Sequence, residues 1–223
     1  MSVSFSPAVR LGAQRAAAAL AGLWLAGCSV LPQPPAQPVR YDFGPELLVA
    51  AAPPPGAAQQ PPIALADVEA PALRSSETSV LYRLAYADAQ VVRPYQFARW
   101  TLPPVQLVQQ RLSSRLGRER SVLHGGDGKV QPRVQGRMPA VLQVEIEEFS
   151  QVFHSAQDSV GWVRLRATLV ERQPQGDVLL GQQYFTAQQP ATSADAAGGV
   201  RALTQATDQA IASLEAWLQQ LGR

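Results

Sequence analysis

Short stretches of alternating apolar and polar residues recur along this chain, which is the pattern of strands buried on one face. In 142–153, Leu142, Val144 and Ile146 share one face. The alternation shifts by one residue at Glu148–Phe149, and such a shift predicts a β-bulge. The pattern predicts strands at 39–44, 63–70, 80–86, 142–153, 163–169 and 178–186.

Two segments have the longer period of amphipathic helices. The first begins at Pro103 and Pro104, because proline is tolerated in the first helical turn, and it ends near Gly117. The second occupies 200–221, with an apolar residue every three or four positions. Stripes this regular predict helices that pack against a sheet.

The order of these elements predicts an α+β fold. We expect one periplasmic domain over 39–223, in which an antiparallel sheet carries two helices packed on one face. Residues 50–62 are rich in Ala, Pro and Gln, and this composition is typical of a low-complexity insertion between strands.

The N-terminus predicts lipid attachment at Cys28, the only cysteine of the chain. Arg10 and Arg15 precede a short apolar run, and Leu-Ala-Gly follows immediately before Cys28. This order is that of a signal peptide, and its ending resembles the lipobox of bacterial lipoproteins. We therefore expect residues 1–27 to be removed and Cys28 to carry a diacylglycerol and an N-acyl chain such as palmitate.

The residues after Cys28 predict a tether. Prolines recur over 28–38, and a proline-rich segment of this length is extended and semi-rigid. We expect the lipidated Cys28 and this segment to hold the folded domain some 30 Å from the lipid headgroups, at about 3.1 Å per residue.

Charge and cysteine content narrow the function classes. The chain has 19 basic and 17 acidic residues, but Arg10 and Arg15 belong to the leader. The mature chain is therefore neutral overall, which gives no reason to expect a nucleic-acid partner. With Cys28 acylated, no thiol is left for a disulfide or a metal site.

The sequence contains few candidate motifs for catalysis or metal binding. The two histidines, His124 and His154, have no companions at metal-ligand spacing, and the glycine-rich stretch that begins at His124 lacks a phosphate-loop pattern. We expect a polar surface loop there, no metal and no enzymatic activity. Four arginines lie late in the first helix and just past it, where they are expected to form a solvated helix end: Arg111, Arg115, Arg118 and Arg120.

Aromatic residues and arginines gather in 82–104, and these residue types are enriched at protein interfaces. Trp100 and Phe97 are expected to pack in the core. Tyr95 and Arg99 are left open between a packing role and a partner-binding role.

The order of these features resembles a known family. Five features together resemble the auxiliary lipoproteins of ABC-type transport systems, the family of the paraquat-inducible lipoprotein. They are a lipobox, the Tyr41-x-Phe43 strand, Tyr82-Arg83, the sequence from Tyr95 to Pro104 and a C-terminal helix with Trp217-Leu218.

The resemblance implies a function that composition alone does not. It implies a non-enzymatic outer-membrane component whose partner is a mammalian-cell-entry-type periplasmic protein. Such systems move lipids or other hydrophobic molecules between the inner and outer membranes. Ser29 favours outer-membrane sorting, because an aspartate there would resemble the inner-membrane retention signal. Homo-oligomerisation is left open. The alternatives are a lipid-binding carrier with its own hydrophobic cavity and, less favoured, an envelope hydrolase.

Overall fold

The computed structural model describes residues 36–45, 60–71, 77–125, 133, 136 and 138–223. The chain divides into a unit Met1–Gln37 and a unit Pro38–Arg223, and the described helices and strands all belong to the second unit. The predicted signal peptide, Cys28, Ser29 and most of the insertion at 50–62 lie outside the described residues. Within the described part, no helix is both long enough and apolar enough to cross a membrane.

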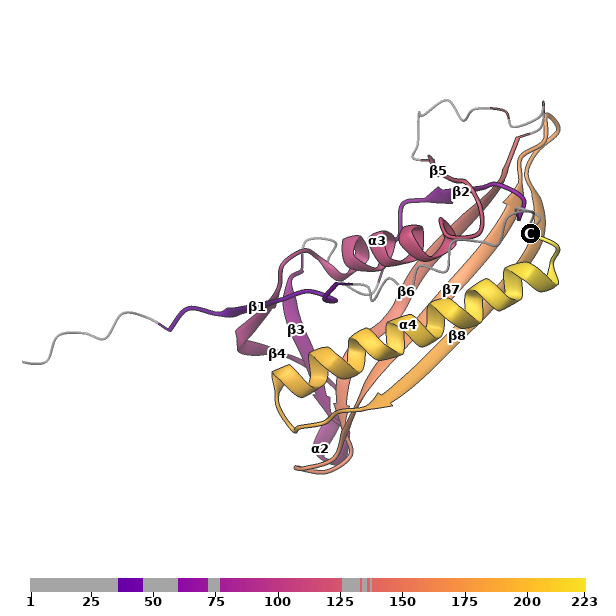
Figure 1. Ribbon diagram of the computed structural model, residues 1–223. Coiled ribbons are helices and arrows are strands. Elements are labelled where there is room, and N and C mark those ends of the chain that lie inside the picture. Colours follow the sequence, from indigo (N-terminus) through magenta and orange to yellow (C-terminus); the bar gives the residue numbers. More distant parts are fainter. Residues whose placement is uncertain (1–35, 46–59, 72–76, 126–132, 134–135, 137) are drawn as a thin grey trace, which may run out of the picture. The chain divides into compact units, whose positions relative to one another are not determined.

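The fold is α+β, as predicted, with one mixed sheet and helices (Figure 1). The strands are β1 (Val39–Tyr41), β2 (Ile63–Ala66), β3 (Ser79–Leu84), β4 (Ala89–Trp100), β5 (Val122–Gly125), β6 (Ala140–Phe153), β7 (Ser159–Glu171) and β8 (Val178–Pro190). The helices are α2 (Ala85–Asp88), α3 (Pro104–Leu116) and α4 (Ala196–Gln220).

Strand β6 organises the sheet. Along one edge it pairs with β7, which continues to β8, so these three strands form the predicted antiparallel meander. Its other edge is shared, because β2 pairs with one end and β3 with the other, both in parallel. The β1–β4 and β2–β5 pairs are also parallel. The antiparallel arrangement therefore holds for β6–β8 and for β3–β4, and the remaining pairs make the sheet mixed.

The predicted β-bulge is confirmed. The β6–β7 register shifts between Ile146 and Glu148, so that Glu147 is the extra residue. The bulge returns Phe149 to the buried face that Val144 and Ile146 occupy, and all three are at most 2% exposed. A strand with strict alternation would have turned Phe149 outward.

Helices α3 and α4 share one apolar core with this face of the sheet. Val163, Leu165, Ala167 and Leu169 alternate along β7 and join a single cluster with the buried stripes of both helices. Figure 1 shows α4 running along β6, β7 and β8. The close approach depends on glycine, because a Cβ on Gly161 of β7 would lie 2.4 Å from the backbone nitrogen of Leu203.

The middle of the chain differs from the predictions. The expected strand 80–86 ends at Leu84, and Tyr86 lies in the short helix α2. A strand at 89–100 was missed, since β4 carries Pro94 and is exposed on both faces over most of its length, which removes the alternation. The expected loop at His124 and Gly125 is the end of β5. The expected first strand ends at Tyr41, before Phe43.

Candidate functional site

The N-terminal end of the folded unit, which would follow the predicted tether, is the first candidate site. We call residues 39–45 the entry segment. Its strand β1 pairs with the last three residues of β4, and Tyr41 extends the contact by accepting a hydrogen bond from the Thr101 N–H at 2.7 Å. The ladder begins at Val39, just after Pro38, which has no N–H to donate.

Phe43 fixes the entry segment to the core. Its side chain is 9% exposed and meets Trp100 edge-on, with 5.6 Å between ring centroids. It also contacts Phe149, at 6.2 Å between centroids. Gly44 follows with a positive φ of 67°, and its N–H donates to the Asp42 carboxylate at 2.8 Å. This turn carries the chain away from the buried ring.

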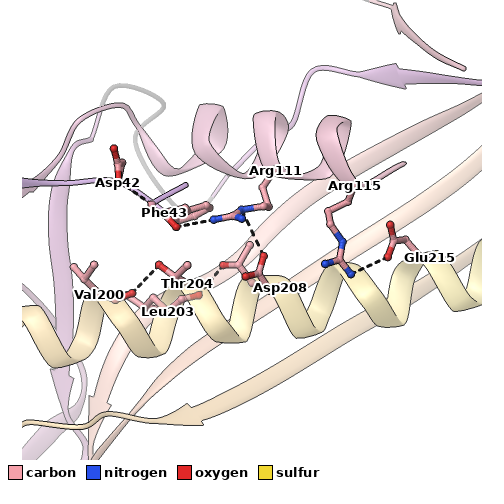
Figure 2. Close-up of polar contacts among 11 residues, drawn as sticks. Asp42, Phe43, Arg111, Arg115, Val200, Leu203, Thr204, Asp208 and Glu215 are labelled. Carbon is pink, nitrogen blue, oxygen red and sulfur yellow. Dashed lines mark hydrogen bonds and ion pairs between the residues drawn. The ribbon is translucent and has the colours of Figure 1, made fainter. Parts of the chain in front are cut away.

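Arg111 of α3 joins the entry segment to both helices (Figure 2). Its Nη2 donates to the Phe43 carbonyl at 2.6 Å, and its guanidinium carbon lies 5.7 Å from the Phe43 ring centroid. On the other side its Nε is 3.5 Å from an Asp208 carboxylate oxygen of α4. One buried cation therefore contacts the entry segment, α3 and α4.

The prediction of a solvated arginine cluster is therefore wrong for two of its members. Arg111 is 8% exposed and Arg120 is 4% exposed. Burial lowers the pKa of Arg120, since desolvation disfavours the charged form. Arg115 faces α4 as well and pairs with Glu215 at 3.3 Å.

Two cavities flank the entry segment. One, of about 390 Å³, lies between Tyr41–Gly44 and the first turns of α4, with Arg40 and Arg201 among its lining residues. The other, of about 210 Å³, lies between Phe43 and α3 and includes Arg111 and Ser114. Both linings combine the apolar ring of Phe43 with charged side chains, including Arg40 and Arg201 in the first cavity and Arg111 in the second.

Tyr95 and Arg99, the two candidates for partner binding, both make contacts within the domain. The Tyr95 hydroxyl donates to Gln151 Oε1 at 2.8 Å, and Gln151 in turn donates to Ser159 at 2.8 Å. The Tyr95 ring lies 4.6 Å from that of Tyr82, and burial raises the pKa of Tyr95 well above its usual range. Arg99 Nη1 donates to the carbonyls of Tyr95 and Ala98 at 2.6 and 2.9 Å. Their partner-binding role stays a prediction.

The expected core residues of this segment behave differently from each other. Trp100 is 1% exposed, as predicted, but Phe97 is 47% exposed, so its predicted core role is wrong. The register between β3 and β4 jumps between Ser79–Arg99 and Leu81–Pro94. The extra residues of β4 form an irregular excursion that turns Phe97 outward.

The outer face of the long strands carries paired charges. Arg166 of β7 contacts Glu145 and Glu147 of β6, and Arg164 contacts Glu147 at 3.1 Å. The Arg164 guanidinium also lies 4.7 Å from the ring centroid of Tyr184. The glutamates thus neutralise neighbouring arginines on a half-exposed sheet face.

One contact involves residue types used in nucleophilic catalysis. Ser113 Oγ lies 3.1 Å from His124 Nε2 on the surface. A working nucleophile also needs a group that orients the histidine, and the described residues bring no carboxylate to this ring. Likewise, no group of three or more metal-ligating side chains forms in the part of the chain that the structure describes.

Comparison with known proteins decides the family. The profile of the ABC-type transport auxiliary lipoprotein component family matches residues 45–215. This chain belongs to that family. The prediction from the sequence is thereby confirmed, and with it the assignment of the chain as a lipoprotein of the cell envelope.

Solved structures agree on the fold. Protein XCC0632 from Xanthomonas campestris, of the DUF330 family, is 17% identical, with 86% of this chain and 92% of that chain covered and a TM-score of 0.57. An uncharacterized protein is 13% identical, with 82% and 99% covered and a TM-score of 0.55. No curated protein matches this chain.

Replacing Arg111 tests the joining role of its guanidinium. In Arg111→Met the Phe43 carbonyl loses its buried donor, and we expect the free energy of unfolding to fall by about 1–3 kcal/mol. Arg115→Met is the matched control one turn later, where a part-exposed ion pair is worth at most about 1 kcal/mol. Urea unfolding of both variants checks this, and equal losses would contradict the special role of Arg111.

Replacing Tyr95 separates its packing role from a binding role. Tyr95→Phe removes one hydroxyl and leaves the buried Gln151 Oε1 without its donor, so we expect a loss of about 1–3 kcal/mol in stability. Tyr86→Phe, at a side chain that is 53% exposed, should leave stability unchanged. Thermal unfolding measures both. An unchanged stability of the Tyr95→Phe protein would contradict the packing role and favour a binding role for Tyr95.

Proposed function

We propose that this protein is a non-enzymatic outer-membrane lipoprotein of an envelope ABC-type transport system that moves lipids or other hydrophobic molecules between the inner and outer membranes. The single observation that carries the proposal is the family match over 45–215. It covers almost all of the folded unit Pro38–Arg223, so the auxiliary role belongs to the domain and not to the leader alone.

The N-terminal sequence supports the place of action. Cys28 at the end of Leu-Ala-Gly is the acylation site in this proposal, and several acyl chains on one cysteine give stable attachment where a single chain does not. Ser29, in place of an aspartate, directs the protein to the outer membrane, where the domain lies on the periplasmic face.

The partner in this proposal is a mammalian-cell-entry-type periplasmic protein, and the domain acts by docking. One feature supports docking over carriage, because the apolar face of the sheet is packed against α3 and α4. The role needs no cofactor beyond the lipid on Cys28.

Partner capture tests the proposal. The lipidated protein, cross-linked in intact cells and purified from membranes, should recover a mammalian-cell-entry-type subunit. Arg164→Ala, on the outer face of the sheet, is tested in the same way, and a lower recovery of the subunit would place this face in the contact. Repeated recovery of no transport subunit from cross-linked cells, with the lipoprotein itself fully recovered, would contradict the proposed partner.

Sorting is tested at Ser29. Ser29→Asp should move the protein from outer-membrane to inner-membrane fractions, because it creates the residue associated with retention. Ser29→Ala is the control and should stay in the outer membrane. Density-gradient separation of the two membranes gives the distribution, and wild-type protein found in the inner membrane would overturn the outer-membrane assignment.

A further inference from the structure

Exposed apolar side chains gather along one edge of the sheet. Among the described residues, nine large hydrophobic side chains are exposed, and five of them lie on β1, α2 and β4. We call these five the β4 edge patch: Val39, Tyr86, Val91, Val92 and Phe97, which are between 38% and 54% exposed. Grouped exposed apolar residues mark interaction surfaces. Because Val178, Leu179 and Tyr184 are also exposed on β8 at the opposite edge, the feature that distinguishes the β4 edge patch is its place next to the tether, where Val39 is its first residue.

The β4 edge patch is open on both sides of the strand. Val91 and Val92 are neighbours, so their side chains point to opposite faces, and both are exposed. Strand β1 covers only Ala98–Trp100 of the outer edge. Among the described strands, the rest of β4 therefore has β3 as its only neighbour.

The edge is poorly suited to accept another strand. Arg83 Nη1 donates to the Ala89 carbonyl at 3.3 Å, and Arg99 Nη1 donates to the Tyr95 and Ala98 carbonyls. Pro94 has no N–H to offer. Three carbonyls and one N–H position of β4 are thereby unavailable to an added strand.

The patch also carries cations that are free to bind phosphate. Arg40, beside Val39, and Arg93, beside Val92, are exposed and have no ion-pair partner among the described residues. The neighbouring carboxylates of Asp42 and Asp88 each accept a backbone N–H. Arginine and aromatic side chains beside aliphatic ones suit the headgroup region of a bilayer, where apolar bodies are buried and polar ends stay hydrated.

The length of the tether favours a membrane as the binding partner of the β4 edge patch. Ten residues separate Cys28 from Val39, the first residue of the patch, and a chain of ten residues spans at most about 36 Å. Lipid attachment would therefore keep Val39, at one end of the patch, within this distance of the bilayer. The tether limits only the largest separation, so an apolar contact beside the anchor can draw the domain closer to the bilayer than the extended length of about 30 Å.

We infer that the β4 edge patch is a second membrane contact, which lays the edge of the sheet against a phospholipid surface beside the tether. The contact goes beyond the proposed transport role, and only its strength in the cell rests on lipid attachment at Cys28. The unlipidated protein has the same patch, so the surface can be tested without the anchor.

The test uses a single reporter on the patch. Cys28→Ala removes the only thiol, and Phe97→Cys then gives one site for an environment-sensitive fluorophore. The mature chain is mixed with vesicles of phosphatidylethanolamine, phosphatidylglycerol and cardiolipin. Leu179→Cys, on the opposite sheet edge and 62% exposed, is the matched control. We expect a blue shift for the label at position 97 and none at position 179.

Flotation with the same vesicles gives the second readout. Val92→Glu in the unlabelled Cys28→Ala chain should lower vesicle partitioning about tenfold, since one apolar burial is lost and a repelled charge is added. Leu179→Glu should leave partitioning unchanged. No blue shift and no flotation, or equal losses in both glutamate variants, would overturn the membrane contact.

A protein partner gives a different pattern. If Val92→Glu abolishes cross-linking to a transport subunit while wild-type protein shows no vesicle binding, the patch binds protein and the membrane inference is wrong. If vesicle binding holds but no transport subunit is ever captured, the membrane contact stands and the proposed partner fails.

Discussion

The structure depends on one buried apolar layer, in which alternate residues of β6 and β7 face α3 and α4. The bulge at Glu147 keeps Phe149 in this layer, and Gly161 lets α4 approach the sheet closely. Each fully buried aliphatic or aromatic side chain contributes about 1.5–3 kcal/mol. The long meander and α4 therefore supply most of the stability on which the less regular parts rely.

The entry segment is tied directly into that layer. Phe43 packs against Trp100 and Phe149, and Arg111 connects its carbonyl to both helices. A buried cation is costly unless it is paired and hydrogen-bonded, and the Phe43 carbonyl, the Phe43 ring and Asp208 together provide those contacts. A load carried by a lipid tether would thus reach the centre of the domain and not a loose terminus.

Much of the fold could be predicted from the sequence, because period and burial are local properties. The meander, both long helices and the bulge follow from positions such as Ile146, Phe149 and Leu203, whose neighbours show the same period. Strand β4 could not be predicted, since a strand exposed on both faces has no alternation to detect.

The candidate site was harder to predict than the fold, because tertiary partners decide the roles of its residues. Arg111 falls within the buried stripe of α3, next to Leu112, and that position was a usable signal for burial. Nothing in the sequence pairs it with Phe43, 68 positions away.

A folded auxiliary domain held at a membrane through Cys28 is the central claim, and mass spectrometry of the intact protein from native membranes tests it most directly. The expected species is a mature chain that begins at Cys28 and carries a diacylglyceryl group and an N-acyl chain. A chain that retains residues 1–27, or an unmodified Cys28 thiol on membrane-extracted protein, would contradict the claim.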